Sequence, residues 1–104
     1  MNNTYLMGEK TYRLHYSIGR LEMIEKAAGV SAMTMFAKAG NQELPPISLL
    51  NMYFAYGLLE DGGVYAPLKA ALEFAAQQME ENGYNSIMNA VLEQLQEDCG
   101  FLFR

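Results

Sequence analysis

The feature that most constrains the fold is the run from Gly8 to Gly29, in which a strand pattern passes directly into a helical pattern. From Thr11 to Tyr16 every second side chain is apolar, which places the apolar ones on one face of a strand. A preceding strand at residues 3–7 joins it through Gly8, since glycine accepts the positive φ of a tight hairpin turn. A lone hairpin is marginal in water, so we expect it to lie on helices or to gain strands from another chain.

The rest of the chain is predicted to be helical, with most helices ending at a glycine. Ser17 is a plausible N-cap for the first helix, and Gly29 stands where a C-terminal glycine belongs. The third helix carries apolar side chains almost all round, which is typical of a central helix. We expect helices at about residues 18–28, 32–39, 47–61, 67–82 and 85–99.

The length of 104 residues predicts one domain with a core of its own. Apolar residues make up 51% of the chain and charged residues 18%, as in a globular protein. The sequence therefore predicts a mainly helical α+β fold, a single domain over 1–104 with a hairpin at 3–16, a helical part at 17–99 and an apolar tail at 100–104. The tail either docks on the core or serves as a hydrophobic handle for another chain.

The net charge of −5 is unevenly placed. Residues 1–38 hold five basic and three acidic side chains, whereas residues 39–104 hold two basic and nine acidic ones. An acidic surface repels phosphate, so nucleic acid is not an expected partner. A helix-turn-helix in the first two helices is a weak alternative, because the second helix offers Lys38 as its one basic side chain. The asymmetry is either a solvated surface or a means for one copy to dock on another.

No set of residues in the sequence points to catalysis or to a cofactor or metal. His15 has no visible partner that would orient it as a general base. Cys99 follows Glu97 and Asp98, whose negative charge disfavours a thiolate. These are the only histidine and cysteine in the chain, too few for a zinc site. The sequence therefore predicts a protein that is not an enzyme.

The enriched feature is adaptable apolar surface, with eight methionines and seven tyrosines. Methionine packs against many shapes, and tyrosine is favoured at protein contacts. The alternative is that these side chains fill the core. The candidate partner-binding residues on the second and third helices and in the tail are Met33, Met35, Phe36, Met52, Tyr53, Tyr56, Phe101 and Phe103.

The order of these signals resembles a family of small tail proteins of tailed phages and gene transfer agents, which includes tail assembly chaperones. The resemblance lies in the glycine turn at Gly8, the strand residues Tyr12-Arg13-Leu14, and the helix over 21–29 with its Ile24-Glu25 pair and terminal glycine. A short helix over 30–39, a helix-start signal at 44–48 and the Gly-Leu segment at 57–59 continue it. The similarity covers about residues 8–100.

The resemblance implies a tail assembly chaperone that covers the apolar, helical tape measure protein until the tail tube forms around it. It implies a protein partner and self-association through the hairpin edge or the charge asymmetry. The alternatives are a structural component of the tail, in the tube or as a terminator, and a generic bacterial adaptor between proteins. We expect no membrane partner and a location in the cytoplasm of the bacterial host, because no apolar run is long enough to span a bilayer and residues 1–10 do not resemble a signal peptide.

Overall fold

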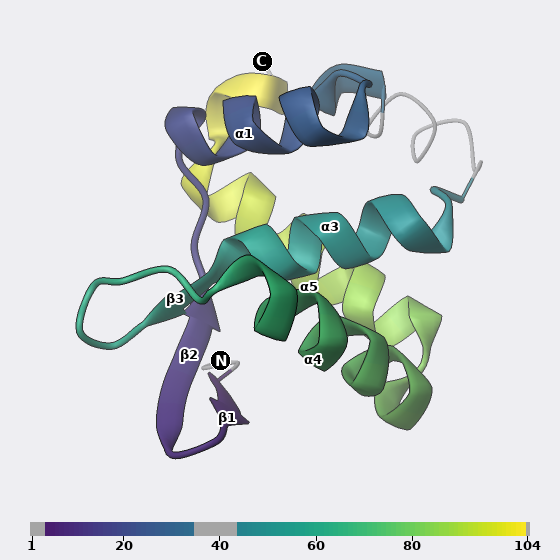
Figure 1. Cartoon of the computed structure of the whole chain (residues 1–104). Helices are drawn as coiled ribbons and strands as arrows, with labels where there is room; N and C mark the ends of the chain where they lie inside the picture. The colour runs from purple at the N-terminus through teal and green to yellow at the C-terminus, as the bar shows by residue number, and fades with distance from the viewer. Residues whose placement is uncertain (1–3, 35–43, 104) are drawn as a thin grey trace.

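The computed structural model describes residues 4–34 and 44–103 and has the mainly helical α+β fold that the sequence predicts (Figure 1). Residues 32–34 are helical and begin the expected second helix, whose remainder lies outside the described residues. The elements with described bounds are β1 (Thr4–Met7), β2 (Lys10–Leu14), α1 (Ile18–Ala28), α3 (Ile47–Gly57), β3 (Leu58–Glu60), α4 (Leu68–Asn82), α5 (Tyr84–Asp98) and the 3₁₀ helix η1 (Gly100–Phe103).

The sheet has three antiparallel strands in the order β1-β2-β3. Gly8 adopts a φ of 66° in the hairpin turn, as the sequence predicts. Tyr12 and Leu14 of β2 are buried on the inner face, whereas Arg13 between them is exposed. The hairpin is therefore stabilised by a third strand from the same chain and by the helices that its inner face contacts.

The third strand corrects the prediction of a helix over 47–61. Helix α3 ends at Gly57, and the chain continues as β3, which pairs antiparallel with β2. The pairing starts at the last residue of α3, because the His15 amide donates to the Gly57 carbonyl at 2.8 Å. The apolar pattern of Leu58 and Leu59 suits a helix and a strand equally well, and the unpaired edge of β2 decides the outcome.

Helix α3 lies at the centre, with α1 on one side, α4 and α5 on the other, and the sheet at its C-terminal end (Figure 1). Its position follows from its composition, because apolar side chains surround it almost completely. The rings of Tyr5, Phe54 and Phe74 join β1, α3 and α4, with the Tyr5 and Phe54 centroids 5.0 Å apart. The buried residues of α3 are Leu49, Leu50, Tyr53, Phe54, Ala55, Tyr56 and Gly57.

The helix ends mostly follow the sequence signals. Ser17 accepts a hydrogen bond from the Arg20 amide at 3.1 Å, and Gly29 ends α1 with a φ of 76°. The helix expected at about residues 85–99 begins at Tyr84, directly after Gly83, and has no side-chain cap. Gly83, with its φ of 88°, supplies the sharp turn between α4 and α5.

Candidate functional site

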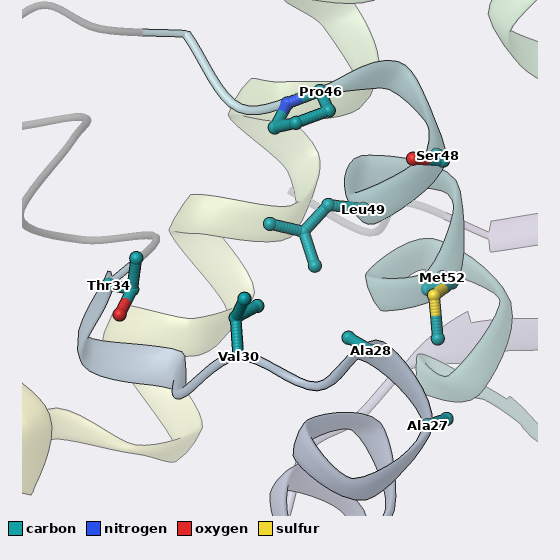
Figure 2. Close-up of a pocket in the computed structure, with 8 residues that line it drawn as sticks. All are labelled: Ala27, Ala28, Val30, Thr34, Pro46, Ser48, Leu49 and Met52. Atoms are coloured by element: carbon teal, nitrogen blue, oxygen red, sulfur yellow. The ribbon is translucent and has the colours of Figure 1, made fainter.

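A groove of about 250 Å³ separates the C-terminal end of α1 from the N-terminal end of α3. Figure 2 shows its two walls, one formed by α1 and the turn after it, the other by the start of α3. Among the residues that the structure describes, the side chains around it are small or apolar, and none carries a charge. The lining residues are Ala27, Ala28, Val30, Thr34, Pro46, Ser48, Leu49 and Met52.

The first wall is shaped by the way the chain leaves α1. The left-handed conformation of Gly29 turns the chain away from the helix axis, and its amide donates to the Glu25 carbonyl at 2.8 Å. The Glu25 carboxylate then accepts from the Ala32 amide at 2.6 Å, which ties α1 to the next helical turn. Ser31 caps that turn, accepting from the Thr34 amide at 3.2 Å. Val30 and Thr34 are thereby held at the groove.

The second wall, at the start of α3, is attached to helix α5. Pro46 precedes α3, and its carbonyl accepts from the Leu50 amide at 3.0 Å. The Tyr84 hydroxyl donates to the carbonyl of the buried Pro45, so the start of α3 is attached to the start of α5. Both walls are held by hydrogen bonds outside the groove, and we infer that the space between them persists without an occupant.

The chemistry of the groove is that of an apolar contact. Its polar side chains are the hydroxyls of Thr34 and Ser48, and neither has a base or a carboxylate beside it in the lining. Its volume is below the usual range for sites of drug-sized ligands and cofactors, which starts at about 300 Å³. The groove suits one or two apolar side chains of another protein.

The opposite end of the α1–α3 contact is closed by Arg20. Its guanidinium carbon lies 3.8 Å from the centroid of the Tyr65 ring and 5.4 Å from that of Tyr56. The Nε atom donates to the Tyr56 carbonyl at 2.9 Å, in the last turn of α3, where a cation also meets the negative end of the helix dipole. These contacts join α1 to the end of α3 and to the loop that carries Tyr65.

Tyr16 fills the space between the sheet and the end of α3. Its side chain is 1% exposed, and its hydroxyl donates to the Tyr53 carbonyl at 2.6 Å. A Cβ atom at Gly57 would lie 2.6 Å from the Tyr16 Cζ atom, so glycine is required for the two to fit. This end of the contact has no room for another side chain.

A polar cluster around Asp98 supports the same junction. The carboxylate accepts from the Tyr16 amide and from the Gln94 side chain, each at 2.9 Å. His15 Nδ1 lies 3.5 Å from the same carboxylate oxygen. The sequence did not indicate Asp98 as the partner of His15, because the two residues are 83 positions apart. The carboxylate joins the β2–α1 junction to the end of α5.

Cys99 beside this cluster is fully buried, and burial together with the negative charge of Asp98 raises the pKa of its thiol. The thiolate is disfavoured, as the sequence predicts, and burial is the larger cause. Within the described residues no group of three or more histidine, cysteine, aspartate or glutamate side chains is placed to hold a metal ion.

The structure places the predicted partner-binding residues in three different situations. Met52 lines the groove, and the exposed Met33 lies next to Thr34 in the chain. Phe101 in η1 is 45% exposed. Tyr53 and Tyr56 are in the core, at 1% and 7% exposed, so they offer no surface to a partner. Met35, Phe36 and the side chain of Phe103 lie outside the described residues.

Sequence reasoning missed the small residues that create the groove. Ala27 and Ala28 end the apolar stripe of α1 where larger side chains would fill the space against α3. The pair of alanines before Gly29 is the signal that could have indicated the groove. Two alanines leave a space only if α3 lies at a suitable distance, and the sequence does not give that distance.

None of the helices in the described ranges is long and apolar enough to cross a bilayer. Comparison with family models, with curated proteins and with solved structures gave no match for this chain.

Proposed function

We propose that this chain is a tail assembly chaperone of a phage or prophage, which binds apolar helical segments of the tape measure protein and catalyses no reaction. The observation that carries the proposal is the uncharged groove between α1 and α3. The family resemblance of the sequence supplies the biological setting, and the groove supplies the physical means.

The surface beside the groove extends the apolar contact. Val30 is 40% exposed and Ile47, next to Ser48 in the chain, is 59% exposed. Met33 and Leu44 are 53% and 63% exposed. An amphipathic helix of a client would place one large side chain in the groove and rest its neighbours on these residues. The thioether of Met52 in the lining adapts to side chains of different shape.

A small contact of this kind is weak for one copy, which suits the proposed role. A long apolar helix aggregates unless its surface is covered, and many copies along one client cover it without a single strong site. Weak individual binding also allows tube subunits to displace the chaperone. The protein should accordingly be absent from finished particles.

The test is coexpression with the tape measure protein encoded in the same phage or prophage. We expect the client to remain in the supernatant and to copurify with the chain. The variant Ala27→Trp fills the groove from an exposed helix position and should reduce copurification by about tenfold, since an anchor side chain contributes on the order of 1–2 kcal/mol.

Ala76→Trp is the matched control, because Ala76 is also an exposed alanine of a helix but lies on α4 away from the groove. It should bind as the unaltered chain does. A client that stays equally soluble without the chain, or equal binding by both tryptophan variants, would contradict the proposal. Detection of the chain in purified virions would favour a structural component of the tail.

A further inference from the structure

Strand β1 is an edge strand, and no strand of the described residues pairs with its outer edge. The two-residue turn Gly8-Glu9 makes Met7 and Lys10 a hydrogen-bonded pair, so Leu6 and Thr11 form the next, non-hydrogen-bonded pair. The Thr11 carbonyl indeed points the other way and accepts from the Asp61 amide at 3.2 Å. By the same alternation, the backbone amides and carbonyls of Leu6 and Thr4 point away from β2.

Strand β1 has only four residues, but it lacks the charges and prolines that usually protect an edge strand. Its sequence, Thr4-Tyr5-Leu6-Met7, contains no charged residue, proline or glycine. Leu6 is 70% exposed on the outer face of the sheet. Within the described residues, Thr4 and Leu6 of β1 therefore present donors and acceptors that no other strand uses.

A cleft of about 200 Å³ lies beside β1. Tyr5 forms one side of it, and the end of α4 and the first half of α5 form the other, through Asn82, Ser86, Asn89 and Glu93. No residue of β2 or β3 lines the cleft, so it lies on the open side of the sheet. Figure 1 likewise shows β1 between β2 and the pair of helices α4 and α5.

The lining of this cleft favours a polar, positively charged occupant. Asn82 uses its side-chain nitrogen to donate to Gln78 at 2.8 Å, which leaves its carbonyl oxygen as an acceptor. Glu93 is exposed and is the one charged side chain among the described residues that line the cleft. Tyr5 is held edge-on against Phe54 and Phe74, so the wall beside the strand is fixed.

We propose that the open edge of β1 and the adjacent cleft bind an extended segment of a partner protein, which pairs with Thr4 and Leu6 as a fourth strand and places a lysine or arginine against Glu93. Strand addition supplies the main-chain hydrogen bonds, and the cleft supplies the selectivity. The occupant is not β1 of a second copy, because that strand has no basic side chain for Glu93. The site is separate from the groove between α1 and α3 and does not depend on the proposed function.

The test uses the full chain and a short blocked peptide that alternates threonine and lysine, with a threonine–glutamate peptide as the second probe. Binding is followed by NMR through the amide resonances of Thr4 and Leu6. We expect the lysine peptide to shift both resonances saturably at low salt, with at least about tenfold weaker binding of the glutamate peptide, because like charge at Glu93 opposes it.

Leu6→Pro removes the outward-pointing amide without removing a bond to β2, since proline is tolerated where an edge amide faces solvent. Its matched control, Leu6→Thr, keeps the amide. Because proline has no amide proton, binding to Leu6→Pro is followed through the Thr4 resonance alone. We expect Leu6→Pro to weaken the lysine peptide about tenfold, the usual scale for a lost hydrogen bond with its strand contacts, and Leu6→Thr to bind as before.

Glu93→Gln should weaken the lysine peptide several-fold and reduce its salt dependence, whereas Glu80→Gln, an exposed carboxylate on α4 outside the lining, should not. The proposal is overturned by unshifted Thr4 and Leu6 resonances at millimolar peptide, or by equal binding to both Leu6 variants. It is also overturned if the resonances shift with protein concentration alone while sedimentation shows a dimer, because the edge then pairs with a second copy. Ala27→Trp should leave peptide binding unchanged, which separates this test from that of the groove.

Discussion

The two ends of the α1–α3 contact are built in opposite ways. At the end near the sheet, Tyr16 and Arg20 fill the space and bond to the carbonyls of Tyr53 and Tyr56. At the other end, Ala27 and Ala28 face α3 and leave about 250 Å³ open. The same pair of helices is therefore tightly packed at one end and incompletely packed at the other.

The difference shows how one interface provides both stability and a binding surface. The closed end holds α1 in place through buried, directional contacts that allow little adjustment. The open end is held by hydrogen bonds on either side of the groove, so its small side chains are not needed to fasten the helices. A partner side chain can enter there without disturbing the contacts that hold α1.

The largest expected effect is a loss of folding stability at high pH, which comes from the closed end and not from the open one. Burial raises the pKa of Tyr16 well above its ordinary value, and burial with the charge of Glu25 raises the pKa of Tyr53 to about 12. Above about pH 10 the unfolded chain releases these protons while the folded chain retains them, so stability falls as pH rises. Alkaline unfolding should be cooperative, so the loss of helical circular dichroism and the rise of tyrosinate absorbance should occur at the same pH.

The variant Tyr16→Phe tests whether Tyr16 contributes to this loss of stability at high pH. It should be less stable at neutral pH, because the Tyr53 carbonyl loses its buried donor, but its stability should fall less steeply above pH 10. Tyrosinate absorbance that rises fully before any loss of helical signal would show that the closed end tolerates ionisation. The described residues that line the open end include no titratable side chain, and we expect them to add nothing to the pH dependence.

The next effect is expected from Gly57→Ala. The added methyl would meet the immobile Tyr16 ring, and overpacking of this kind costs about 1–3 kcal/mol. Gly19→Ala is the control, since a Cβ there meets only the Ser17 Oγ atom at 3.9 Å. It should stabilise α1 by about 0.5–1 kcal/mol through helix propensity. Urea unfolding measures both, and equal midpoints for the two variants would refute the close fit.

Arg20→Ala should have a somewhat smaller effect, a loss of about 1–2 kcal/mol from the hydrogen bond and the contact with Tyr65. Arg20→Lys retains the charge but not the flat guanidinium that lies over the ring. We expect lysine to recover less than half of the loss in urea unfolding. Full recovery of stability by lysine would mean that the positive charge alone stabilises the closed end.

The smallest effect is expected from Ala27→Leu at the open end. The larger side chain extends into the groove, and the change in stability should lie between zero and a gain of about 1 kcal/mol. Ala76→Leu on α4 provides the comparison for helix propensity without a groove. A loss of more than about 1 kcal/mol from Ala27→Leu would mean that the groove is less accessible than its volume indicates.

Much of the local structure could be predicted from particular residues. Gly8 indicated the hairpin turn, Ser17 and Gly29 the ends of α1, and the apolar surface of α3 its central place. Gly8, Ser17 and Gly29 act through the backbone of their own segments, and the composition of α3 requires burial whatever covers it, so these predictions need no knowledge of the rest of the fold. The strand β3 was missed because its apolar pattern permits a helix and only pairing with β2 distinguishes them.

The candidate sites could be predicted only in part for a similar reason. Met52 was expected to contact a partner and lines the groove, but Tyr53 and Tyr56 are core residues although they lie on the same helix. Which face of an all-round apolar helix is covered depends on its neighbours. The pairing of His15 with Asp98 also depends on the packing of α5 against the sheet junction.

The sequence by itself determined the hairpin turn at Gly8, the ends of the first helix at Ser17 and Gly29, and the helical character of most of the chain, because these are properties of residues close together in the chain. The tertiary structure decided that Gly57 must be glycine, that two alanines leave a groove and that β1 has an open edge beside α5. Those features arise from distances between segments that are remote in the chain, and such distances are set only when the core packs.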